Sequence, residues 1–163
     1  MKILFAGEGG QGVQLAAEIL AHAAFLEGKG ASLIPNFGVE QRGGVSLAFI
    51  IIDRDVSYPK FEKADILAVF CDRAIKRVQR YIDRSTIIFS GPAVTSKVSE
   101  NQEFRVEDKD LPVKVWNILV LGKIVKQTKI VNKKQIITAL EEKLAEKFNK
   151  DPSLKELNLK ALL

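Results

Sequence analysis

A glycine-rich turn near the start of the chain is the first segment whose residue types could do chemistry. Gly7, Gly9 and Gly12 match the pattern Gly-x-Gly-x-x-Gly between an apolar run and a helical pattern. Glycines let a backbone turn tightly and approach a ligand, and the first turn of a helix offers unpaired N–H groups with a partial positive charge. The turn therefore predicts a surface that can accept an anion, with Gly9, Gly10, Gln11 and Gly12 as its candidate residues.

Three interpretations of this turn are open at the level of the residues. A dinucleotide site would need an acidic residue at the end of the next strand to hold a ribose, and that stretch, Ser32–Pro35, contains none. A glycine turn can also serve only to pack a helix on a sheet. In the third interpretation, exposed N–H groups of the turn contact a partner chain or an anionic ligand. A Walker A loop is excluded because no Lys-Ser or Lys-Thr pair follows Gly12.

The segment from Pro35 to Gly44 is the second unusual part of the sequence. It carries Glu40, Arg42 and a Gly43–Gly44 pair just after a predicted strand, at the edge where open α/β sheets bind ligands. A guanidinium can clamp a phosphate or a carboxylate with two hydrogen bonds, and Glu40 could orient Arg42 or meet a partner. We therefore expect both loops to form one surface at the carboxyl ends of the strands, with Arg42 among the ligand-binding residues.

The remaining composition excludes several kinds of site. The chain of 163 residues has one cysteine, Cys71, and one histidine, His22, so alone it cannot hold an iron–sulfur cluster or a typical zinc site. No nucleophile and base pair lies near either loop, so we predict no catalytic and no metal-binding residue. The net charge is +5, but the sequence contains no nucleic-acid-binding motif. Because no apolar run approaches the ~20 residues of a membrane span, we expect a cytoplasmic protein that binds neither nucleic acid nor membrane.

The hydrophobic pattern predicts the elements that must position these loops. A buried strand at residues 2–6 leads through the glycine turn into a helix over 11–27 and a strand at 31–34. This strand–helix–strand order predicts parallel pairing of the two strands with a right-handed crossover. Further elements are expected as strands at 45–52, 66–70, 86–89 and 104–106 and as a short helix over 72–81.

The last third of the chain is predicted to be helical. One helix covers 115–126, and Asn132 with Gln135 marks the N-cap and capping-box positions of a second. The pair Asp151–Pro152 starts a third helix, as cap and first helical residue. We predict one domain over residues 1–163. Its expected fold is α/β: a three-layer, Rossmann-like open sheet, mostly parallel, with helices on both faces and a helical C-terminal extension.

Several motifs, in order and with matching spacing, resemble one known family. The segments Gly7–Val13, Ala17–Leu20, Glu27–Lys29 and Phe37–Gly44 resemble the gamma subunit, or gamma domain, of pyruvate, 2-oxoglutarate and branched-chain 2-oxoacid ferredoxin oxidoreductases. Indolepyruvate oxidoreductase has a similar domain. The resemblance covers nearly the whole chain. It also includes the family's Asn…Leu-Gly helix and its C-terminal Asn-x-x-Ala, matched here by Asn117, Leu121–Gly122, Asn158 and Ala161.

The resemblance implies a subunit of an enzyme that oxidatively decarboxylates a 2-oxoacid, 2-oxoglutarate or pyruvate, to acyl-CoA, CO2 and reduced ferredoxin. It implies that thiamine diphosphate, magnesium and iron–sulfur clusters belong to alpha-, beta- and ferredoxin-like delta-type partner subunits. This chain would then bind no cofactor tightly, would support assembly and would lie near the entry of the co-substrate CoA. Isolated, it is expected to be inactive, with a homodimer as one form it can take. A stand-alone NAD- or FAD-binding module and a structural interaction domain are the alternatives.

Overall fold

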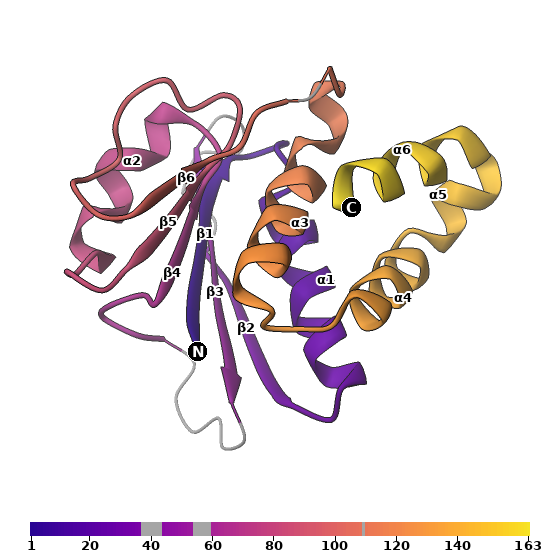
Figure 1. Cartoon of the computed structure of the whole chain (residues 1–163), viewed down its shortest axis with the longest axis horizontal. Coiled ribbons are helices and arrows are strands. Elements are labelled where there is room, and N and C mark those ends of the chain that lie inside the picture. Colours follow the sequence, from indigo (N-terminus) through magenta and orange to yellow (C-terminus); the bar gives the residue numbers. More distant parts are fainter. Residues whose placement is uncertain (37–43, 54–59, 109) are drawn as a thin grey trace.

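A six-stranded sheet forms the centre of the molecule (Figure 1). The computed structural model describes residues 1–36, 44–53, 60–108 and 110–163. In the sheet the strands follow the order β2-β3-β1-β4-β5-β6. Their bounds are β1 (Lys2–Glu8), β2 (Gly30–Asn36), β3 (Val45–Asp53), β4 (Ile66–Val69), β5 (Ile87–Ser90) and β6 (Glu103–Arg105).

The central strands are apolar because both faces of the sheet are covered. Along β1, Ile3 and Phe5 belong to the apolar cluster on one face, and Leu4 and Ala6 to the cluster on the other. All four side chains are fully buried. Successive side chains of a strand point to opposite faces, so a strand buried on both must be apolar throughout. This requirement explains the unbroken apolar run that predicted the strand.

Strand β3 runs against the other strands of the sheet. It is antiparallel to both of its neighbours, β1 and β2, whereas the pairs β1–β4, β4–β5 and β5–β6 are parallel. The expected direct pairing of the first two strands is therefore wrong: β1 and β2 point the same way, but β3 lies between them. The connection from β2 to β3 is short, which favours a hairpin over a crossover. The predicted class, a mostly parallel α/β sheet with helices on both faces, is confirmed.

Helices cover the two faces unequally (Figure 1). Helices α1 (Val13–Leu26) and α3 (Trp116–Thr128) pack on one face, and α2 (Asp72–Val78) packs on the other. Helices α4 (Lys133–Lys143), α5 (Ala145–Lys150) and α6 (Pro152–Leu162) form a further layer outside α1 and α3. Short 3-10 turns at Gln79–Tyr81 and Val113–Val115 follow α2 and precede α3. Of the described helices, none combines the length and the hydropathy that crossing a membrane requires.

The two predicted helix caps are confirmed. Asn132 Oδ1 accepts the backbone N–H of Gln135 at 3.0 Å, and α4 starts directly after Asn132, at Lys133. Asp151 Oδ1 accepts the backbone N–H of Ser153 at 3.1 Å, with Pro152 as the first residue of α6. Each cap satisfies an N–H group that the first turn of a helix leaves without an intrahelical partner.

The second half of the capping box is supplied from elsewhere in the chain. The carboxylate of Glu27, at the end of α1, accepts the backbone N–H of Asn132. Glu27 also pairs with Lys29 at 2.6 Å. Burial alone would raise the pKa of Glu27, but the Asn132 N–H and the Lys29 ammonium outweigh that effect and hold the pKa below its ordinary value. The end of α1 is thereby joined to the start of α4.

Candidate functional site

The ends of the two predicted loops meet at one edge of the sheet. The backbone N–H of Gly9 donates to the carbonyl oxygen of Gly44 at 3.1 Å, and Glu8 at the end of β1 is paired with Val45 at the start of β3. Antiparallel pairing puts the end of one strand beside the start of the next, so Gly44 lies against the glycine turn. Glu40, Arg42 and Gly43 fall outside the described residues, and their roles stay predictions.

Two glycines of the turn adopt a backbone that other residues disfavour. Gly10 has a φ of 95° and Gly12, the N-cap of α1, has a φ of 73°. A Cβ on Gly12 would lie 2.3 Å from Nδ2 of Asn117, whereas one on Gly10 would have no neighbour within 4 Å. Asn117 is buried at the start of α3, and its Nδ2 donates to the Gly12 carbonyl oxygen at 3.2 Å. Gly12 is therefore the position where α1 and α3 meet.

Only part of the turn keeps amide hydrogens for a ligand. The N–H of Gly9 is used by Gly44, and the N–H of Gln11 donates to the Glu8 carbonyl oxygen at 3.1 Å. The Gln11 side chain turns back as well, because its Oε1 accepts the N–H of Glu8 at 2.8 Å. The amides of Gly10 and Gly12 donate to no described residue, and no described side chain caps the first turn of α1. Backbone N–H groups in this position, at the start of a helix, can donate to an anion.

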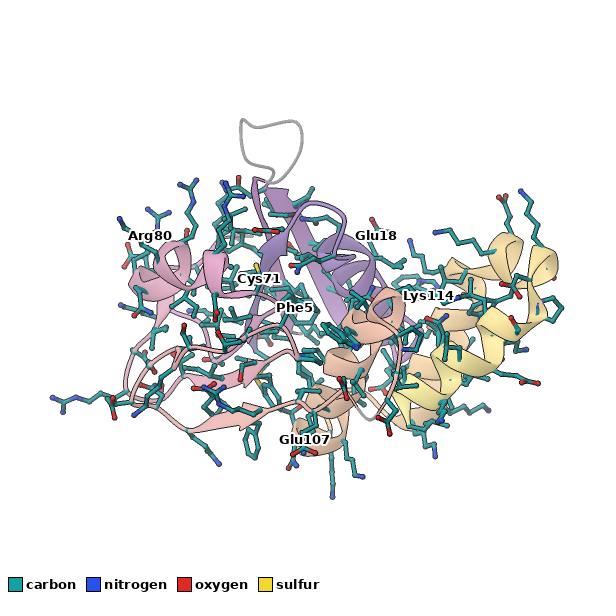
Figure 2. The ribbon with its side chains drawn as sticks, turned by 90° about the horizontal axis from the view of Figure 1, so that it is seen from above. Phe5, Glu18, Cys71, Arg80, Glu107 and Lys114 are labelled. Carbon is teal, nitrogen blue, oxygen red and sulfur yellow. The ribbon has the colours of Figure 1, made fainter. Side chains whose placement is uncertain are left out.

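A pocket of about 310 Å³ opens beside these amides. The turn forms one wall, and residues that follow β4 and β5, among them Phe70 and Gly91, form another. The start of α3 and the side chain of Lys147 from α5 complete it, and the charged side chains among its described lining residues are Lys114 and Lys147. Lys114 lies on the side of the sheet that carries α3 and the C-terminal helices (Figure 2). The pocket is therefore lined both by the glycines of the turn and by two lysines.

Sequence reasoning did not find the two lysines of this pocket. Lys114 and Lys147 are far apart in the sequence and belong to no pattern with the glycine turn. They meet it because α3 begins at the edge where β1 ends and because α5 packs on α6, which in turn packs on α3 (Figure 1). The signal available was Asn117, which the family resemblance singled out and which fixes the start of α3 on the turn.

The cysteine and the histidine occupy structural positions. Cys71 follows β4 inside the molecule (Figure 2), and burial first, then the nearby Glu8 carboxylate, raises the pKa of its thiol. His22 Nε2 lies 2.5 Å from Oε2 of Glu142 and links α1 to α4. Over the part of the chain that the structure describes, no group of three or more His, Cys, Asp or Glu could hold a metal ion.

The sheet order also bears on the dinucleotide interpretation. In a dinucleotide-binding fold, the ribose-holding acid ends the strand that lies parallel and adjacent to the first one. Here the neighbour of β1 on that side is the antiparallel β3, and β2 lies one strand further away. The end of β2 carries no acidic residue, and it does not lie next to the end of β1. Both facts disfavour a dinucleotide at the turn.

Comparisons with known proteins agree with the fold and the motifs. The model of the pyruvate ferredoxin/flavodoxin oxidoreductase family matches residues 2–163. A subunit of 2-oxoglutarate synthase, KorC, from Archaeoglobus fulgidus is 36% identical over 99 residues, which span 60% of this chain and 53% of that protein. The KorC subunit of Methanocaldococcus jannaschii is 31% identical over 152 residues, covering 85% of this chain and 81% of that protein.

A solved structure extends this similarity to the backbone. The gamma subunit of a keto/oxoacid ferredoxin oxidoreductase from Geobacter sulfurreducens has a TM-score of 0.78 and 27% sequence identity. The match covers 99% of this chain and 93% of that subunit. The family model, the relatives and the solved structure point the same way as the motifs at residues 7–13 and 37–44. The chain therefore belongs to the pyruvate ferredoxin/flavodoxin oxidoreductase family.

Proposed function

We propose that this chain is the gamma-type subunit of a 2-oxoacid:ferredoxin oxidoreductase and that its glycine-turn pocket holds the anionic end of CoA. The complex would oxidatively decarboxylate pyruvate or 2-oxoglutarate to the acyl-CoA. Membership of the family supports the first part, together with relatives named as subunits of 2-oxoglutarate synthase and of pyruvate/ketoisovalerate oxidoreductases. The cytoplasmic location expected from the sequence is part of the same proposal.

One observation carries the assignment to CoA. Gly10 and Gly12, whose amides donate to no described residue, and Lys114 and Lys147 line one pocket of about 310 Å³. Phosphate oxygens accept hydrogen bonds from backbone amides at a helix start and attract lysine side chains. A pocket of this size can enclose a phosphate and its sugar but not the whole of CoA. The remaining part of the cofactor would extend towards the catalytic subunits.

The rim of the pocket supports a contact with those subunits. Val113 is 68% exposed beside the half-buried Trp116, whose Nε1 donates to the Leu111 carbonyl oxygen at 2.8 Å. An exposed apolar side chain next to a fixed tryptophan is typical of a protein-binding surface. Thiamine diphosphate and magnesium would sit on the alpha- and beta-type partners. The iron–sulfur clusters would sit on partner subunits such as a ferredoxin-like delta chain, since one cysteine cannot ligate a cluster.

The CoA assignment can be tested in the reconstituted complex. Lys114→Ala and Lys147→Ala should each raise the KM for CoA about tenfold, because each removes an ammonium from the phosphate site. The KM for the 2-oxoacid should not change. Lys150→Ala, an equally exposed lysine of α5 that does not line the pocket, is the matched control. A viologen-dye assay measures both constants, and an unchanged KM for CoA in the double variant would overturn the assignment.

The predicted role of Arg42 enters the same assay. Arg42→Ala is expected to weaken saturation by CoA or assembly of the complex.

For the partner surface, Val113→Glu should stop the chain from co-purifying with the catalytic subunits, because it puts a charge on the apolar rim. Phe25→Glu is the matched control, since Phe25 is also 68% exposed and lies at the far end of α1. Equal retention of both variants in the complex would place the interface elsewhere.

A further inference from the structure

A groove lies where the second half of α3 meets the start of α4 and the end of α6. Cavities of about 500 Å³ and about 260 Å³ share Gly122, Lys126, Leu162 and Leu163, so they form one continuous depression. Its floor is apolar. A Cβ on Gly122 would lie 2.2 Å from the carbonyl oxygen of Leu162, so the glycine lets α6 end directly against α3. The contact between α3 and the end of α6, which forms the floor, therefore depends on the missing side chain at Gly122.

Four lysines, Lys123, Lys126, Lys129 and Lys133, line this depression, which we call the lysine groove. Among the described residues, none of the four takes part in an ion pair. Glu107 is the single carboxylate side chain among the described residues that line the groove. Arg105, which pairs with Glu103, also lines the groove, so the charged side chains of its described lining are mainly positive.

Helix electrostatics account for only half of this charge. Lys126 lies in the last turn of α3 and Lys129 at its C-cap, where the helix dipole favours cations. Lys133 lies in the first turn of α4, which contains no acidic residue, and there the dipole disfavours cations. Lys129 is also a non-glycine residue with a φ of 51°. A charge that local structure disfavours on one side of a groove indicates a use outside the fold.

We propose that the lysine groove binds an acidic segment of a partner protein, with an apolar side chain of that segment on the floor. The lysines are spread along two helices and three of them are exposed, so they do not converge on a point as a site for a small anion would. No aromatic side chain is among the described lining residues, so bases of a nucleic acid would find no stacking surface. An extended acidic chain matches both the spread of charge and the apolar floor.

The lysine groove and the glycine-turn pocket lie at opposite ends of α3. The helix begins beside the pocket at Trp116 and ends at Thr128, next to the groove. Figure 1 shows α3 running from the edge where β1 ends to the opposite edge. The glycine-turn pocket and the lysine groove share no lining residue. A partner docked at the turn therefore leaves the groove open to a second partner.

A labelled peptide of glutamates around a central leucine tests this proposal on the full chain by fluorescence anisotropy. At low salt the wild-type chain should bind it, and the triple variant Lys126→Glu, Lys129→Glu, Lys133→Glu should bind at least about tenfold more weakly. The matched control reverses the same number of charges on the α2 side of the sheet: Lys76→Glu, Arg77→Glu and Arg84→Glu, all exposed. That control should keep affinity within about twofold. A peptide with glutamines in place of the glutamates should not bind.

Several results would overturn the proposal. Equal weakening in both triple variants would show that only net charge attracts the peptide. Equal binding of a peptide without the leucine would show that the apolar floor does not contribute to the interaction. Tighter binding of a single-stranded oligonucleotide, or displacement of the peptide by an equal concentration of inorganic phosphate, would assign the groove to another ligand. A thermal melt shows whether the groove variant is folded, and if it is not, Lys126→Gln with Lys133→Gln answers the same question.

Discussion

The two ends of α3 carry positive charge for different structural reasons. At its start, the glycine-turn pocket is shaped by Gly12 and Asn117, which contact each other and leave no space for a larger residue. At its end, the lysine groove is rimmed by four lysines that form no ion pair within the described chain. Substitutions of Gly12 or Asn117 should therefore cost more stability than substitutions of the groove lysines. That contrast separates residues that the fold needs from residues kept for a partner.

The largest effect is expected for Gly12→Ala. It should lower the free energy of unfolding by about 3 kcal/mol, because the new Cβ meets Asn117 and a φ of 73° disfavours alanine. Gly10→Ala has a φ of 95° but open space, so it should cost about 1 kcal/mol. Denaturant titration of both variants gives the two values. Equal costs would mean that close packing at the start of α3 contributes nothing.

Asn117→Ala should cost about 1.5 kcal/mol, because it leaves the Gly12 carbonyl without its buried donor. The same truncation removes the side-chain atoms that a Cβ at position 12 would clash with. Gly12→Ala with Asn117→Ala should therefore cost less than the sum of the single variants. Asn158→Ala is the control for this pair, because Asn158 is about as buried but donates to the Leu154 carbonyl oxygen of its own helix. Its cost should add to that of Gly12→Ala. Strict additivity with Asn117→Ala would contradict the contact on which the pocket depends.

Stability should depend on pH through Glu27, which fixes the α4 side of the groove. Its folded-state pKa lies below the ordinary value of 4.5, so its contribution is complete above pH 4.5 and is lost as the pH falls through the lower folded pKa. Glu27→Gln should cost about 1 kcal/mol near pH 7 and nothing once the wild-type carboxylate is protonated. Unfolding curves of the two proteins should converge below pH 4.5. Glu100→Gln, on an exposed side chain, should give curves that stay close at every pH.

The smallest effect has a sign that tests the groove directly. Lys133→Glu should raise the free energy of unfolding by about 0.5 kcal/mol, because it places an anion in the first turn of α4. Lys126→Glu, the same change in the last turn of α3, should lower it by about 0.5 kcal/mol. Opposite shifts in thermal melts would confirm that one side of the groove is charged against the preference of its helix. A loss of stability in both variants would mean that the fold uses Lys133.

Local features were predictable from the sequence, and non-local ones were not. The glycine turn, the start of α1 and the caps Asn132 and Asp151 follow from residues within a few positions of each other. The place of β3 between β1 and β2 depends on pairing between distant segments, which the hydrophobic pattern does not encode. The same holds for Glu27, which takes the capping role expected of Gln135 from more than a hundred residues away in the sequence.

The candidate site divides in the same way. Gly10 and Gly12 were predicted because a helix that follows a glycine turn has a recognisable pattern. Lys114 precedes α3 and Lys147 lies on α5, and they reach the pocket only through tertiary packing, so no spacing could have indicated them. The joint surface with Glu40 and Arg42 stays a prediction, as does the single-domain organisation. What the structure adds is that Gly44, the last residue of that loop, touches the turn.

The place of β3 between β1 and β2 has a consequence for how the chain folds during synthesis. β1 pairs with β3 along its whole length, from Lys2 opposite Ile51 to Glu8 opposite Val45. While the ribosome extends the chain, β1 therefore stays unpaired until β3 has emerged, because both of its neighbours in the sheet come later in the sequence. The hairpin of β2 and β3 closes over a short separation, which makes it the early event, and β1 joins it later at a greater loop-closure cost. Nascent chains arrested before Asp53, the end of β3, should consequently leave the first strand open to chaperones.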